Sequence, residues 1–232
     1  MLDLSSLRDS SRVKWETHCH TVYSNRRRRR FDALNTPREM IEAAISKGLG
    51  GMIITDHDSV KGGIVGKANA REYKGFKVLP GAEVTSRSGH ILAIGIVTDV
   101  PKGLSVEETV EKIHDLGGIA IASHPFSSRV RPSLGEECLK ADGVEVFNAT
   151  NRGRSNSSAR ALAQEHGRPG TAGSDAHWVR TVGSAGIVCD NPVEDIVRGR
   201  VALFGEYAST WDMRVFNFRQ LASSLVNSPL WK

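Results

Sequence analysis

The sequence predicts a single α/β domain in which strands alternate with helices and close into a barrel. Short apolar runs recur along the chain with helix signals between them, and about seven such strand–helix units favour a barrel over an open sheet. A chain of 232 residues with 39% hydrophobic residues is enough for one such barrel and its core. No long linker, low-complexity segment or internal repeat divides the sequence, so we expect residues 1–232 to form one domain.

Seven strands are predicted from these runs. Their almost continuous apolar character is typical of parallel strands that are buried on both faces. The predicted strands are residues 13–20, 51–55, 76–79, 91–97, 119–123, 143–147 and 171–174.

Helices are predicted between the strands. Residues 36–39 form a capping box with proline at the first helical position, and Gly48 ends that helix. Residues 105–108 form a second capping box, whose helix ends at the glycine pair 117–118. Weaker helix patterns cover residues 59–73, where three glycines dilute the signal, and 157–166.

The C-terminal part carries no recognisable motif. Residues 13–188 hold every candidate functional residue, and we expect the tail of residues 189–232 to pack on the barrel and cover one edge. Within it, residues 193–198 are predicted to form a helix.

The net charge of +5 comes from one place, because without the five arginines Arg26 to Arg30 the sum would be 5 − 5 = 0. A charge run is often only a solvated surface. If it overhangs an active site, it would attract a nucleotide or a nucleic acid, so both interpretations stay open.

Composition also predicts the compartment. No stretch approaches the ~20 apolar residues needed to cross a bilayer, and the N-terminus has no signal-peptide pattern. Three cysteines are too few and too unpatterned for a disulfide framework. We therefore expect a cytoplasmic protein without a membrane partner.

Histidines gather at the ends of the predicted strands, where barrel enzymes assemble their active sites. His18 and His20 are two apart on a strand, so both imidazoles face one side and can reach one ion, while Cys19 faces the helices. Asp175 and His177 repeat this spacing after the last predicted strand. Each pair alone also fits an ordinary structural role.

Three further strand ends carry potential ligands. His57 follows a buried strand between Asp56 and Asp58, for which bracing a histidine and capping a turn are the alternatives. Glu83 ends the next strand; a carboxylate there can bridge two ions, and the alternative is a surface acid. His90 and His124 flank the following strands, with hydrogen-bonded core histidines as the alternative.

Substrate contacts are predicted from the loops at the same strand ends. Arg129 and Arg131 follow His124, and Arg180 follows His177. Guanidinium groups bind phosphate oxygens in pairs, although each arginine is equally compatible with a solvated surface position. Asn148, at the end of a strand, is a further candidate contact.

The order of these motifs resembles the polymerase and histidinol phosphatase (PHP) family. The resemblance runs from about residue 13 to residue 188 and is specific in combination. The motifs are His-x-His at 18–20, Thr-Asp-His at 55–57, Gly-x-Glu at 81–83, Gly-His at 89–90, Ser-His-Pro at 123–125 and Gly-Ser-Asp-x-His at 173–177.

The resemblance implies a distorted (β/α)7 TIM-like barrel with a trinuclear metal centre at its mouth. One ion would be held by His18, His20, Glu83 and Asp175. Glu83 would bridge to a second ion, held also by His90 and His124, and a third would use His57 and His177. Similar proteins carry an acid or histidine where this chain has Asn25, so the third site is expected to be weaker, with Asp32 or Asp58 as the possible substitute.

These ligands imply a metal-dependent phosphoesterase that uses a metal-activated water and two or three divalent ions. Imidazole and carboxylate ligands suit zinc, manganese and iron alike. Phosphorylated small molecules, nucleotides and nucleic-acid ends are the expected substrates. The alternatives are a 5′-to-3′ exonuclease on short single strands and a non-catalytic nucleic-acid-binding barrel. The residues expected at the reacting centre are His18, His20, Glu83, Asp175 and His177.

Overall fold

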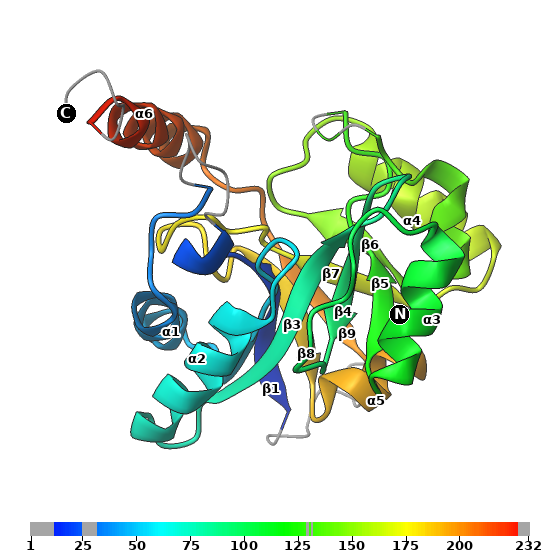
Figure 1. The fold of residues 1–232 in the computed structure, drawn as a ribbon, viewed down its shortest axis with the longest axis horizontal. Helices are drawn as coiled ribbons and strands as arrows, with labels where there is room; N and C mark the ends of the chain where they lie inside the picture. The colour runs from blue at the N-terminus through cyan, green and yellow to red at the C-terminus, as the bar shows by residue number, and fades with distance from the viewer. Residues whose placement is uncertain (1–11, 25–31, 129, 131, 227–232) are drawn as a thin grey trace, which may run out of the picture.

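The computed structural model describes residues 12–24, 32–128, 130 and 132–226. One nine-stranded sheet curls into a nearly closed barrel, with strands in the order β7-β6-β5-β4-β3-β2-β1-β8-β9 (Figure 1). The strands are β1 Val13–Cys19, β2 Gly51–Ile54, β3 Lys77–Thr85, β4 His90–Ile94, β5 Ile119–Ala122, β6 Gly143–Asn148, β7 Gly170–Gly173, β8 Ala185–Cys189 and β9 Ala202–Gly205.

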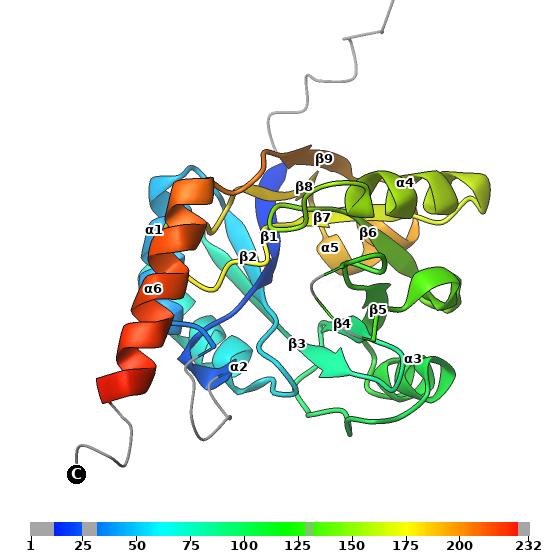
Figure 2. The same cartoon turned by 90° about the horizontal axis from the view of Figure 1, so that it is seen from above.

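The barrel closes where β1 meets the chain that follows β7. Cys19 and Ala176 form a parallel bridge, and the amide of His20 donates to the carbonyl oxygen of Ala176 over 2.8 Å. Seen from above, the strands form an almost complete ring (Figure 2). The ends of β1 and β7 are thereby brought together, although they lie far apart in the sequence.

The predicted barrel is confirmed, but not all of its strands are parallel. β4 is antiparallel to both β3 and β5, and β8 and β9 are antiparallel to their neighbours. Only residues 86–89 separate β3 from β4, and a parallel crossover needs a dozen residues or more, so the two strands form a hairpin. β8 and β9 were not predicted; β9 is short and mostly exposed, so it lacks the apolar signal of a buried strand.

Helices cover the outside of the barrel. Both predicted capping boxes are present, at Thr36 with Glu39 and at Ser105 with Glu108. The helices are α1 Pro37–Ser46, α2 Lys61–Asn69, α3 Val106–Asp115, α4 Ser155–Glu165, α5 Pro192–Val197 and α6 Thr210–Val226, with 3-10 turns η2 Val22–Ser24, η3 Ala70–Glu72 and η4 Gly135–Lys140. In the part of the chain described, no helix is long and apolar enough to span a membrane.

The glycines that weakened the helix signal in α2 have a packing role. A Cβ at Gly63 would lie 2.6 Å from the Cα of Pro80 in β3, and one at Gly62 would collide with the carboxylate of Asp56. Glycine therefore lets α2 approach the sheet more closely than any other residue would, at a cost in helix propensity.

Apolar side chains fill the interior below the end of the barrel that carries the histidines. Trp15, Ile53, Leu92, Ile121 and Ile187 belong to one buried cluster contributed by five different strands. A register shift between Glu16 and Cys19 interrupts the pairing of β1 with β2. In a regular strand Trp15 and His18, which are three residues apart, would point to opposite faces of the sheet. The register shift allows both side chains to face the interior of the barrel.

Candidate metal centre

The predicted ligands meet at one end of the barrel, which we call the mouth. They come from six segments that are distant in sequence and share only their position at strand ends. β1 and the residue directly after it supply His18 and His20, the loop after β2 supplies His57, β3 supplies Glu83, the start of β4 supplies His90, the loop after β5 supplies His124, and the loop after β7 supplies Asp175 and His177.

Glu83 lies at the centre of this group and is 1% exposed. Its Oε1 is 2.9 Å from Nδ1 of His90 and 3.0 Å from Nε2 of His124. Its Oε2 faces a different set of imidazole nitrogens at 3.3–3.4 Å, those of His18, His20 and His57. The two oxygens of one carboxylate thus divide the histidines between them.

Among the described residues, four overlapping groups of side-chain atoms are each close enough together to hold a metal ion. In each group the atoms are all within 4.8 Å of one another. The groups are His18, His20 and Asp175; His18, Glu83 and His124; His57, Glu83 and His90; and His20, Asp32, His57 and His177. The overlap of the groups matches a multinuclear centre with shared ligands, and the division of residues among individual ions stays a prediction.

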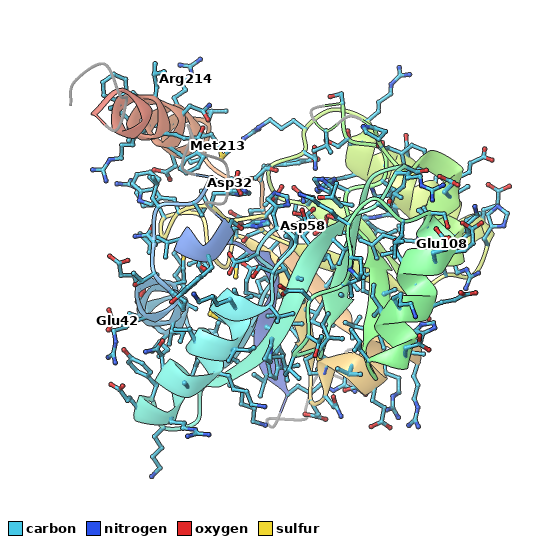
Figure 3. All side chains as sticks on the ribbon, in the orientation of Figure 1. Asp32, Glu42, Asp58, Glu108, Met213 and Arg214 are labelled. Carbon is cyan, nitrogen blue, oxygen red and sulfur yellow. The ribbon has the colours of Figure 1, made fainter. Side chains whose placement is uncertain are left out.

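Asp32 rather than Asp58 joins the fourth group. Oδ2 of Asp32 lies 3.4 Å from Nε2 of His177 and 3.6 Å from Nε2 of His57. Asp58 turns away, in a left-handed conformation with φ of 51°, and accepts hydrogen bonds from the amide and hydroxyl of Thr85. Asp58 therefore braces the end of β3 instead of capping the following helix, whose N-cap is Val60. Figure 3 places Asp32 beneath α6 and Asp58 at the end of β3.

Acidic residues behind the ligands hold the imidazoles in place. Glu145 in β6 lies 2.9 Å from Nδ1 of His18 through Oε1, while its Oε2 accepts the amide of His124 over 2.9 Å. A carboxylate on one ring nitrogen fixes the tautomer and leaves the other nitrogen for a metal. Sequence reasoning missed Glu145, because an acid inside a strand that follows no motif carries no signal of its own.

Asp56 has the bracing role that was one of its two interpretations. Its carboxylate accepts from the amide and hydroxyl of Thr21 and from the hydroxyl of Ser24. Ser24 in turn lies 3.2 Å from Nδ1 of His20 and accepts the amide of His57. Asp56 thus ties two ligand-bearing loops together.

Burial and neighbouring charges shift the titration of the centre. Burial would raise the pKa of Glu83, but the surrounding histidines hold it well below its ordinary value. Burial lowers the pKa of His57 to about 4, whereas the charges of Asp32 and Asp175 overcome burial and raise the pKa of His177 to about 9. Without a metal the protons therefore help to balance the acids, and binding of cations would displace them.

The backbone is also unusual at the mouth. Asp58, His124 and Asp175 are the three non-glycine residues with positive φ among those described, at 51°, 28° and 53°. Such conformations cost energy and cluster at functional sites when the surrounding structure enforces them. Two of the three are predicted metal ligands.

Two predicted substrate contacts take other positions. Asn148 is fully buried: its Nδ2 donates to Glu145 and Asp175, and its Oδ1 accepts from the amide and hydroxyl of Thr150. Its polar atoms are engaged with Glu145, Asp175 and Thr150, and its role as a substrate contact stays a prediction. Arg180 forms a 2.7 Å ion pair with Asp212 of α6, away from the ligands.

Other predictions lie outside the described residues. These are the substrate contacts Arg129 and Arg131, the weak third-site ligand Asn25, and the arginine run from Arg26 to Arg30.

A pocket of about 230 Å³ opens beside the fourth group of ligands. Asp32, Asp175 and His177 form one side of it, and residues of α6 form another. The tail, predicted to cover an edge, thus also reaches the mouth. The sequence signal that could have shown this is the apolar pair Met213 and Phe216, spaced three apart on one helix face.

Comparison with known proteins places the chain among relatives with these motifs. Residues 16–148 match a family model described as PHP domain, and residues 153–199 match a second model described as PHP-associated. An uncharacterized protein of Methanocaldococcus jannaschii, MJ1587, is 40% identical over 146 residues, which cover 60% of this chain and 84% of that protein.

Solved structures share the fold. A two-domain protein from Bacteroides vulgatus, which contains a predicted PHP-like metal-dependent phosphoesterase, aligns with a TM-score of 0.67 at 16% identity. The alignment covers 84% of this chain and 65% of that one. PsfC from Pseudomonas syringae aligns with a TM-score of 0.66 at 17% identity, over 91% of this chain and 99% of its own length. At these identities the likeness establishes the barrel fold.

Proposed function

Because this chain belongs to the PHP domain family, as the order of its motifs predicted, we propose that it is a metal-dependent hydrolase of phosphate esters. Family membership is a premise and does not choose the reaction, since one fold supports many chemistries. The choice rests on the mouth, where histidines and acids from six segments converge on a single buried carboxylate.

The observation that carries the proposal is that the two carboxylate oxygens of Glu83 face different sets of histidines. Its Oε1 faces His90 and His124, while its Oε2 faces His18, His20 and His57. A carboxylate that only neutralised a histidine would need one such partner. Two sets on two oxygens are the arrangement expected of a ligand shared by two ions, as in hydrolases that act on phosphoryl groups.

The donor set fits borderline divalent cations. Imidazole nitrogens and carboxylate oxygens suit zinc, manganese and iron, and no cysteine among the described residues joins the groups. When bound, such ions lower the pKa of water and neutralise charge on a phosphoryl group. Cys19 is buried with its thiol donating to the carbonyl of Ile53, and burial raises the thiol pKa well above its ordinary value, so it is not a candidate nucleophile.

Other residues of the mouth would orient the ligands and the substrate. Glu145 and Asp56 hold His18 and His20 from behind, directly or through Ser24. Asp175 and His177 both hold ligand positions and line the pocket, so a substrate phosphate in the pocket would lie next to the centre. Positioning of this kind lowers the barrier by holding reactants in place.

The test combines metal analysis with a substrate screen. Protein purified without chelator is analysed by mass spectrometry for zinc, manganese and iron, and we expect at least two ions per chain. The same preparation is assayed on phosphomonoesters, phosphodiesters and short oligonucleotides, before and after chelation. Hydrolysis that is lost with the metal and restored by it supports the proposal; a preparation with two or more ions and no activity on any ester would overturn it.

A further inference from the structure

Helix α6 is docked against the mouth rather than against the body of the barrel. Phe216 is only 8% exposed, and its ring centre lies 6.0 Å from that of His177. Asp212 pairs with Arg180 over 2.7 Å, and Gln220 donates to the carbonyl of Asp32 over 3.4 Å. The helix therefore contacts two of the segments that supply the fourth group of ligands, those of Asp32 and His177.

A stack of charged and aromatic groups reinforces this docking. The guanidinium groups of Arg180 and Arg219 lie 5.4 Å and 5.2 Å from the ring centre of Trp178, which is 6% exposed. Trp178 directly follows His177. Arg219 belongs to α6 and Arg180 is paired with Asp212 of α6, so both contacts link the helix to the segment that carries His177.

The same helix bounds the pocket. Met213, Phe216, Asn217 and Gln220, spaced three, one and three residues apart on one face, line it opposite Asp175 and His177. A pocket of about 230 Å³ is smaller than the roughly 300–1,000 Å³ typical of sites for drug-sized ligands. Figure 1 shows α6 at the end of the chain, standing clear of the sheet, so only its inner face contributes.

Polar groups complete the far side of the pocket. Ser127 donates to Oδ1 of Asn151 over 2.7 Å, and Asn151 is 3% exposed. Ser127 already donates to Oδ1, and Nδ2 of Asn151 could donate to a ligand in the pocket. Between the metal ligands and Asn151 there is room for one compact group with hydrogen-bond acceptors.

We propose that α6 is the wall that selects the substrate, and that the substrate is a phosphomonoester of a small polar alcohol rather than a nucleic-acid strand. This inference rests on the proposed hydrolase function and names its substrate class. A monoester has one substituent, which the pocket holds between Phe216 and Asn151. A diester needs room for a second substituent, and Phe216 would limit that room because it lines the pocket beside His177.

The test uses two matched variants and two matched substrates. Phe216→Ala removes the buried ring; Phe218→Ala removes the same ring two residues on, where it is 72% exposed. Phenyl phosphate and diphenyl phosphate differ only in the second ring. We expect the natural protein to prefer the monoester. Phe216→Ala should shift the ratio of the two kcat/KM values toward the diester by about 10-fold or more. In Phe218→Ala this ratio should stay within about twofold of that of the natural protein.

A binding measurement accompanies the kinetics. Calorimetric titration of metal-loaded protein with inorganic phosphate should give the same affinity for both variants, because phosphate does not reach the wall. Phe216→Leu, which keeps an apolar anchor of smaller size, stands in if Phe216→Ala does not fold, and it should shift the ratio in the same direction by a smaller factor.

The outcomes separate this inference from the function beneath it. If the natural protein is active on phenyl phosphate and the ratio of the two kcat/KM values is unchanged in Phe216→Ala or Phe216→Leu, α6 does not select the substrate. A natural protein that prefers short oligonucleotides overturns the substrate class and supports the exonuclease alternative, while the metal-dependent hydrolase stands. If the metal-loaded natural protein has no activity on any ester, the proposed hydrolase function is refuted as well.

Discussion

Two carboxylates of the barrel are almost equally buried and are held in opposite ways. Glu83, at the centre of the mouth, is surrounded by imidazoles of five histidines. Glu16, at the seam between β1 and β7, accepts hydrogen bonds from backbone amides, those of Thr17, His18, Ser174 and Gly183 at 2.7–3.0 Å.

The difference in partners separates a structural acid from a candidate ligand. Backbone amides are permanent parts of the fold, so the hydrogen bonds of the Glu16 carboxylate are satisfied without a ligand. These bonds also hold together the seam that brings His18 near Ser174. Imidazole nitrogens can exchange a proton for a metal ion, so the surroundings of Glu83 can be rebuilt around cations. Burial of an acid therefore says little about function until its partners are known.

The largest effect is expected at Glu83. Glu83→Gln keeps the shape and removes the charge shared by both sets of histidines, so two ion positions are weakened at once. We expect metal content to fall and kcat/KM to drop well beyond the about 10–100-fold loss typical of residues that only orient ligands. Metal analysis and steady-state kinetics check this, and full metal with full turnover in Glu83→Gln would refute the bridging role.

Asp32 tests whether the acids of the mouth act as separate ligands. Asp32→Asn should weaken one ion by about 100-fold and leave the others in place, because Asp32 belongs to one of the four groups of ligand atoms, together with His20, His57 and His177. Titration of stripped protein with metal gives the number and affinity of binding events. Asp58→Asn is the control and should leave the titration unchanged; a loss there instead would exchange the roles of the two acids.

Glu145 shares features of Glu83 and of Glu16. It holds an imidazole of the centre and a backbone amide, so Glu145→Gln should lower metal affinity or activity by about 10–100-fold. Kinetics at several metal concentrations separate the two, because loss of affinity is rescued by excess metal. If Glu145→Gln instead lowers stability without lowering metal affinity, Glu145 is a structural acid like Glu16.

The smallest effect on activity is expected at Glu16. Glu16→Gln points an amide at a backbone donor, which costs about 1–3 kcal/mol of unfolding free energy as a hydrogen bond is lost in the interior. Urea denaturation of the metal-free protein measures this loss. Metal content per folded chain should match that of the natural protein, and a decrease as large as that of Glu83→Gln would end the distinction drawn between the two acids.

Local signals explain which parts of the fold were predictable. The capping boxes at Thr36 and Ser105 lie within four residues and formed as predicted. The antiparallel pairing of β4 was also visible in principle, because the predicted strands 76–79 and 91–97 leave eleven residues between them, fewer than the dozen that a parallel crossover needs. The edge strand β9 was not, because it buries too little to need an apolar pattern.

The sequence by itself determined which residue types stand at the strand ends, since alternation along a strand puts His18 and His20 on one side and a short loop keeps Asp175 near His177. Tertiary structure alone decided that Asp32 and not Asp58 faces those histidines, that Glu145 holds His18, and that Phe216 stands over the mouth. The physical reason is distance along the chain: local backbone geometry fixes neighbours within a few residues, whereas partners that lie tens of residues or more than a hundred residues apart are chosen by the closure of the barrel and the packing of its tail.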